Sequence, residues 1–97
     1  MEWRLIIEPD AKKDIRDGFA YYKKEAGVDI ARRFRDRVRA GMRNVLEAPE
    51  RWPVFDEHGG RRHLVYKFPY GIIYDLEGSL IVVIAVMHTS RGPGYYR

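Results

Sequence analysis

The chain has 97 residues, none of them cysteine, and its 18 lysines and arginines against 14 aspartates and glutamates give a formal net charge of +4. This length predicts one domain over residues 1–97, and the lack of cysteine excludes disulfides and thiolate metal sites. The longest apolar run, Leu80–Met87, is too short to span a membrane, and the N-terminus lacks the parts of a signal peptide, so we expect a cytoplasmic protein without membrane contact.

The first half of the chain predicts a strand followed by two helices. Glu2–Glu8 alternates apolar and polar side chains, as a strand does, and Pro9 suits the first turn of a helix. Apolar residues then recur at spacings of three and four over residues 10–26 and again over 28–48, with Gly27 between the two runs. Such a short break predicts an antiparallel helical hairpin.

The second half predicts three strands, over Arg62–Phe68, Tyr70–Leu76 and Leu80–Met87, with a tight hairpin turn between the last two. The expected fold class is therefore α+β, in the order β-α-α-β-β-β: an N-terminal strand, an antiparallel helical hairpin and a three-stranded antiparallel sheet. Leu80–Met87 is apolar on both faces, which indicates a central strand. The hairpin covers one face, so the loop over 49–60, the C-terminal tail or a partner protein must cover the other.

The net positive charge is concentrated on the second predicted helix. Arginines stand at positions 32, 33, 35, 37, 39 and 43, and Asp36 is the only acid among them. Such a field attracts nucleic acid, acidic protein segments or the ribosome, whereas the alternative interpretation is a solvated helix face.

The catalytic inventory is sparse. The sequence has no HExxH pair, no serine-nucleophile elbow and no phosphate-binding glycine loop, so we expect no metal and no cofactor. Cations, a histidine and tyrosines flank the last strands, at Arg61, Arg62, His63, Lys67, His88, Arg91, Tyr95 and Tyr96. If they converge at one sheet edge, a metal-free ribonuclease is one interpretation. The other is structural: a hydrogen-bonded histidine and tyrosines that cap the core.

Several short motifs, taken in order, resemble the RelE/ParE superfamily of toxins. They are RRHLV at 61–65, FPYGIIY at 68–74, the Glu77-Gly78 turn and IAVMH at 84–88. The ending, in which His88, Arg91 and Pro93 precede aromatic residues, is similar to that of ParE-like members, with Tyr96 where they often have tryptophan. The resemblance covers nearly the whole chain.

The resemblance implies a growth-inhibiting toxin of a type II toxin–antitoxin module. Its partners would be a cognate antitoxin that wraps the sheet and helices, and operator DNA reached only through that antitoxin. The antitoxin is then a candidate cover for the second face of Leu80–Met87. It also supplies an acidic partner for the arginine row of the second helix, Arg32, Arg35, Arg39 and Arg43.

Within the superfamily, ParE-like members poison DNA gyrase without cleaving nucleic acid, and RelE-like members cleave mRNA in the ribosome. The ending favours gyrase, so we expect the target to be bound by His88, Arg91, Tyr95 and Tyr96. In the ribonuclease alternative the catalytic candidates are Arg62, Lys67, His88, Arg91 and Tyr96, although a mobile tail gives little means of tuning the pKa of Tyr96. A third alternative is a non-toxic remnant that only binds the antitoxin.

Overall fold

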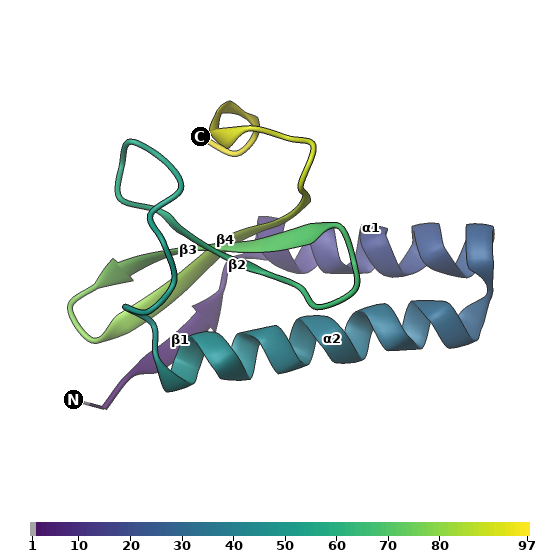
Figure 1. Ribbon diagram of the computed structural model, residues 1–97, viewed down its shortest axis with the longest axis horizontal. Coiled ribbons are helices and arrows are strands. Elements are labelled where there is room, and N and C mark those ends of the chain that lie inside the picture. The colour runs from purple at the N-terminus through teal and green to yellow at the C-terminus, as the bar shows by residue number, and fades with distance from the viewer. Residues whose placement is uncertain (1) are drawn as a thin grey trace.

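The computed structural model describes residues 2–97 and confirms the predicted order of elements. These are β1 (Arg4–Ile7), α1 (Pro9–Ala26), α2 (Val28–Glu47), β2 (Arg61–Leu64), β3 (Tyr70–Glu77), β4 (Leu80–His88) and a short 3-10 helix, η1 (Pro93–Tyr95). Figure 1 shows α2 beneath the sheet, with the loop over 49–60 and the C-terminal segment above it. Within residues 2–97 no helix combines the length and hydropathy needed to cross a membrane.

The two helices form the predicted antiparallel hairpin (Figure 1). Pro9 begins α1, and Gly27 separates the helices with a φ of +95°, a conformation that favours glycine. The helices approach closely where Gly18 of α1 faces Phe34 of α2, because a Cβ on Gly18 would lie 2.6 Å from Phe34 Cζ. Beside this contact Tyr22 of α1 packs on Phe34 at 5.2 Å and on Tyr70, at the start of β3, at 6.1 Å between ring centroids.

The sheet is mixed, with the strand order β1-β4-β3-β2. Strands β2, β3 and β4 are antiparallel, as predicted, whereas β1 runs parallel to β4, with Arg4 opposite Leu80 and Ile7 opposite Val83. The sequence alone had assigned no neighbour to the N-terminal strand. Strand β1 ends at Ile7, opposite Val83, and α1 begins at Pro9. Beyond Val83 the outer edge of β4 therefore lies beside α1 rather than beside a strand.

Strand β2 is shorter than predicted. The expected strand ran over 62–68, but β2 ends at Leu64. The backbone N–H of Val65 donates to Tyr70 O at 2.8 Å, and Lys67 has a φ of +64°, so the residues between them form a tight turn. The apolar and aromatic side chains of residues 65–68 predict a strand, but the backbone hydrogen bond from Val65 to Tyr70 closes a turn instead.

Both faces of β4 are buried, as its composition predicted. On one face Val83 and Val86 pack in a cluster with Phe34 of α2. On the other face β3 and β4 form a smaller cluster, Ile73, Ala85 and Met87, against which Phe55 and Tyr96 pack. The loop and the tail therefore cover this face. Of the three covers that the sequence left open, the loop and the tail are the ones found, and an antitoxin is not needed to bury this face.

Candidate functional site

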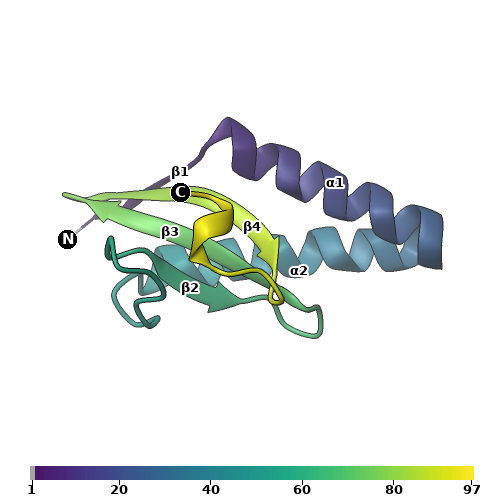
Figure 2. The ribbon, with the colours of Figure 1, turned by 90° about the horizontal axis from the view of Figure 1, so that it is seen from above.

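The end of β4 and the segment that follows it line a cleft at the end of the sheet. His88, Arg91 and Tyr95 contribute to this cleft of about 620 Å³, together with residues from α1 and from the start of β3. Figure 2 shows the C-terminal segment leaving the end of β4 and turning back over the sheet. The structure thus brings together three of the four residues predicted to bind the target, and Tyr96 is not part of the cleft lining.

The opposite wall of the cleft belongs to α1 and is acidic and aromatic. It carries Asp14, Asp17, Tyr21 and Tyr22. Asp14 takes the place of a neighbouring strand, because its Oδ2 accepts the backbone N–H of Val86 at 3.0 Å. Burial raises the pKa of the Asp14 carboxyl, and the hydrogen bond from Val86 opposes part of that rise.

His88 is held by its own turn. The backbone N–H of Ser90 donates to His88 Nδ1 at 3.1 Å, and Ser90 Oγ lies 2.8 Å from the same nitrogen. Since a backbone N–H only donates, Nδ1 is an acceptor and the proton of the neutral ring sits on Nε2. The ring packs edge-on against Tyr70, with 5.6 Å between centroids. The structural role predicted for a hydrogen-bonded histidine therefore applies to Nδ1, whereas Nε2 carries an N–H group that can donate to a ligand.

Arg91 is the exposed cation of the cleft. Its guanidinium lies 4.2 Å from the centroid of the Tyr95 ring, in a cation–π arrangement. Stacking on the face of the ring leaves the N–H donors at the guanidinium edge for an acidic or anionic group. Arg91 and Tyr95 therefore form one exposed recognition unit.

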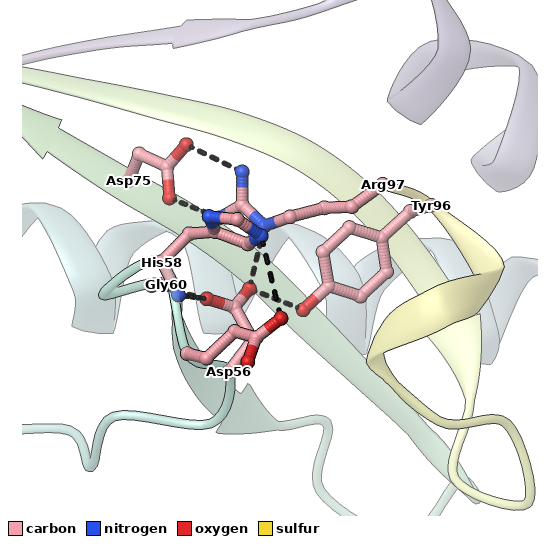
Figure 3. Close-up of polar contacts among 7 residues, drawn as sticks. Asp56, His58, Gly60, Asp75, Tyr96 and Arg97 are labelled. Carbon is pink, nitrogen blue, oxygen red and sulfur yellow. Dashed lines mark hydrogen bonds and ion pairs between the residues drawn. The ribbon is translucent and has the colours of Figure 1, made fainter.

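The last two residues are anchored away from the cleft, on the sheet face that carries the loop over 49–60 (Figure 3). The Tyr96 hydroxyl donates to Asp56 Oδ2 at 2.6 Å, and Arg97 Nε donates to the same oxygen at 2.9 Å. Arg97 also donates to Asp75 Oδ1 of β3 at 2.7 Å. The expectation of a mobile tail is wrong for these residues, because buried and charged hydrogen bonds hold them.

These bonds move the pKa values of the groups involved. Burial on its own would raise the pKa of Asp56, but donors from Tyr96, Arg97 and the backbone of Gly60 and His58 outweigh it and hold the pKa well below its usual range. Burial, reinforced by the bond to Asp56, raises the pKa of Tyr96 above that of an ordinary tyrosine. Tyr96 is therefore poorly suited to act as a general acid or base near neutrality.

The lowered pKa of Asp56 predicts a pH-dependent stability. The contribution of its charged form is fully present above about pH 4, the ordinary aspartate pKa, and is lost as the pH falls towards the lower folded value. Asp56→Asn should cost about 2 to 3 kcal/mol of unfolding free energy at pH 6. Urea denaturation of both proteins at pH 6, 4 and 3 should show this difference shrinking as the pH falls. A constant difference would mean that the carboxylate charge is not what stabilises the fold.

Sequence reasoning missed Asp56, Asp75 and Arg97. A partial signal existed, because Asp56 precedes a His58-Gly59-Gly60 turn and aspartate commonly accepts hydrogen bonds from backbone N–H groups two or more residues later. Here Asp56 Oδ1 accepts from His58 at 2.9 Å and from Gly60 at 2.8 Å. The partners from the tail are about 40 residues away, and no local pattern marks them.

The remaining ribonuclease candidates do not join His88 and Arg91. Arg62 lies over the Phe55 ring, with its guanidinium carbon 4.3 Å from the ring centroid, and Lys67 lines a different hollow between α2 and β2. His63 is buried against Trp52, with 4.0 Å between ring centroids, and burial lowers its pKa. The structure thus places these cations and rings at separate positions rather than around one phosphate.

Part of the arginine row lines two adjoining grooves on the hairpin. Arg35 and Arg39 line a groove of about 450 Å³ with an apolar floor formed by Ile7, Ile15, Phe19, Val38 and Met42. Arg43 lines a neighbouring groove of about 380 Å³ that shares Met42. Arg32 lies outside both linings, 3.9 Å from Asp29. Among residues 2–97 no acidic side chain lines either groove, so both suit an acidic partner with apolar anchors.

Comparison with known proteins gives one family and one fold. The model of the family described as "ParE toxin of type II toxin-antitoxin system, parDE" matches residues 5–93. A solved structure described as "Chromosomal ParDE TA system from P. aeruginosa" superposes with a TM-score of 0.81 at 13% sequence identity, covering 90% of this chain and 96% of that chain. No curated protein matches the chain. In residues 2–97 no three histidine, cysteine, aspartate or glutamate side chains are grouped as metal ligands.

Proposed function

The chain belongs to the family of ParE toxins of type II toxin–antitoxin systems, and from this we propose that it arrests growth by inhibiting DNA gyrase. In this proposal the protein acts in the cytoplasm as one domain, and a cognate antitoxin keeps it inactive. The target is gyrase engaged with DNA, and the protein itself cleaves no nucleic acid.

The observation that supports gyrase over the ribosome is the composition of the cleft. A ribonuclease needs a general base, a general acid and cations around one phosphate. Of the five ribonuclease candidates, only His88 and Arg91 line the same cleft. The Tyr96 hydroxyl donates a hydrogen bond to Asp56, and the pKa of Tyr96 is raised. An exposed arginine and tyrosine beside a half-buried histidine are better suited to grip a protein surface than to cut RNA.

The arginine-lined grooves support the second part of the proposal, which concerns the antitoxin. An acidic amphipathic segment would place apolar residues on Phe19 and Met42 and carboxylates beside Arg35 and Arg39. None of the residues that line these grooves also lines the cleft. Neutralisation would then act by blocking access or by holding the toxin in a larger complex, and not by direct competition for Arg91.

Two parallel assays test the proposed function. Purified protein is added to gyrase with relaxed and supercoiled plasmid, and separately to translating ribosomes with a defined mRNA. We expect inhibited supercoiling or accumulation of cleaved plasmid, and an intact mRNA. Codon-positioned mRNA cuts with full gyrase activity would overturn the proposal in favour of a RelE-like ribonuclease. No effect in either assay, from protein that binds its antitoxin, would indicate a non-toxic remnant.

Arg91→Ala should weaken gyrase inhibition by about tenfold or more, because it removes the exposed guanidinium of the cleft. Its effect on unfolding free energy should stay within about 0.5 kcal/mol, since the side chain is on the surface. The measurements are gyrase inhibition titrations and urea denaturation. Arg33→Ala is the matched control, because it removes an exposed arginine that lines neither the cleft nor the grooves. Equal inhibition by both variants would exclude Arg91 from the site.

A further inference from the structure

The segment that carries Arg91 and Tyr95 is anchored at its two ends. At the first end Thr89 N donates to Pro69 O at 2.8 Å, next to the end of β4. At the second end Tyr96 and Arg97 bind Asp56. Between the anchors, residues 90–95 are exposed, and their backbone hydrogen bonds join them only to one another, to His88 and to Tyr96. The place of this segment beside the cleft therefore depends on both ends.

We propose that Asp56 is a positioning residue for target recognition: its buried carboxylate anchors the end of the tail and so holds Arg91 and Tyr95 at the cleft. The inference rests on the proposed function, because it assigns a role in binding the target to a residue that does not line the cleft. Asp56 lies in the loop over 49–60, which precedes β2, whereas Arg91 follows β4. Three strands therefore separate the two residues in the sequence.

The geometry at Asp56 is that of a preformed acceptor. Oδ1 takes two backbone N–H donors from its own loop, those of His58 and Gly60, and thereby fixes the carboxylate. Oδ2 is left for the tail and accepts from Tyr96 and Arg97. The Asp56 side chain is only 1% exposed, so this acceptor would be costly to leave unpaired. The tail is the only partner in residues 2–97 that binds Oδ2.

Two neighbours show that the space around the carboxylate is closely filled. A Cβ on Gly60 would overlap Asp56 Oδ2 and lie 2.7 Å from Arg97 Nη2, so the loop backbone passes directly against the bound tail. Asp75 of β3 holds the far side of the Arg97 guanidinium at 2.7 Å. The Tyr96 ring packs on the Ile73, Ala85 and Met87 cluster, so the same anchor also covers the sheet.

Anchoring matters for binding because a free tail must be ordered when it meets its target. Each side chain that is ordered only on binding weakens affinity, and a preorganised segment avoids that loss. The grooves proposed for the antitoxin share no lining residue with Asp56 or the tail. Release of the tail should therefore weaken target binding by roughly 10- to 100-fold and leave antitoxin binding within about twofold.

The test combines a mobility measurement with two binding measurements. The chain contains no cysteine, so Gly94→Cys gives a single attachment point for a nitroxide spin label, at a position where a Cβ meets no atom within 4 Å. Asp56→Asn keeps an oxygen for the loop N–H groups but presents an amide N–H₂ to Arg97. Glu57→Gln is the matched control, since it removes a neighbouring carboxylate whose side chain is 90% exposed. The double variant Tyr96→Phe/Arg97→Leu removes both side-chain donors and leaves the loop intact.

We expect the label to become mobile in Asp56→Asn and in the double variant, and to stay restricted in the parent and in Glu57→Gln. Gyrase inhibition should fall in the same two variants, with antitoxin affinity retained. A label that stays restricted in both variants, or a mobile label with full gyrase inhibition, would overturn the inference. If the parent itself leaves gyrase unaffected, the proposed function fails, and the label still shows whether Asp56 anchors the tail.

Discussion

Replacing Arg35 and Arg39 together by glutamate is expected to weaken antitoxin binding by about 100- to 1,000-fold. Both arginines line a groove without acidic side chains, so an acidic partner loses two favourable charges and meets two repulsive ones. Calorimetric titration with the cognate antitoxin at two salt concentrations measures the effect, which should be smaller at high salt. Gyrase inhibition by the free variant should match that of the parent.

The control for this experiment is Arg32→Glu with Arg33→Glu, which reverses the same charge on the same helix. Both side chains lie outside the two groove linings, so their reversal should cost less than about tenfold in affinity. If both pairs of substitutions weaken binding equally, the antitoxin responds to the overall charge of α2, and the groove is not its site. Arg32 would then contribute to antitoxin binding, as the sequence predicts for the arginine row.

Phe34→Ala should lower the unfolding free energy by about 3 to 5 kcal/mol, because it removes a fully buried ring. The ring lies 5.2 Å from Tyr22, 5.5 Å from Phe68 and 4.9 Å from Tyr70, measured between centroids, so its loss leaves a cavity among aromatic neighbours. Urea denaturation measures the loss. Since Tyr22 and Tyr70 also line the cleft, target binding should weaken even in the fraction that remains folded.

Two controls accompany Phe34→Ala. Phe34→Leu keeps most of the buried volume and should cost clearly less, about 1 to 2 kcal/mol. Tyr21→Ala removes an aromatic side chain of the same hairpin that is 57% exposed, and should change stability by less than about 1 kcal/mol. A loss below about 1 kcal/mol for Phe34→Ala would mean that α1 can close onto the vacated space, which Gly18 would then permit.

The local elements of this fold were predictable because local physics decides them. The helices follow from apolar spacing, and their boundaries from Pro9, Gly27 and Pro49. The turn between β3 and β4 follows from Gly78, whose φ is +61°. The error in β2 arose where side-chain pattern and backbone disagreed: residues 65–68 look like a strand, but the hydrogen bond from Val65 to Tyr70 makes a turn.

The candidate site was predictable only in part, because only some of its residues are close together in the sequence. His88 and Arg91 stand three residues apart at the end of β4, so their proximity is a local matter. The acidic wall of the cleft comes from α1, more than 60 residues earlier in the chain, and nothing in the spacing of Asp14 marks it as a neighbour of Val86. Tyr96 was grouped with Arg91 because it is near in sequence, and the structure separates the two by anchoring Tyr96 to Asp56.

By itself, therefore, the amino-acid sequence determined the order of elements, the α+β class, the central place of β4 and the resemblance to the RelE/ParE superfamily. Each of these depends on residues close together or on a pattern that a single strand or helix displays. Only the tertiary structure decided that β1 runs parallel to β4, that the tail covers the sheet, and that Asp56 holds the tail in place. Those are contacts between distant segments, and their free energy depends on burial and pairing that exist only once the chain has folded.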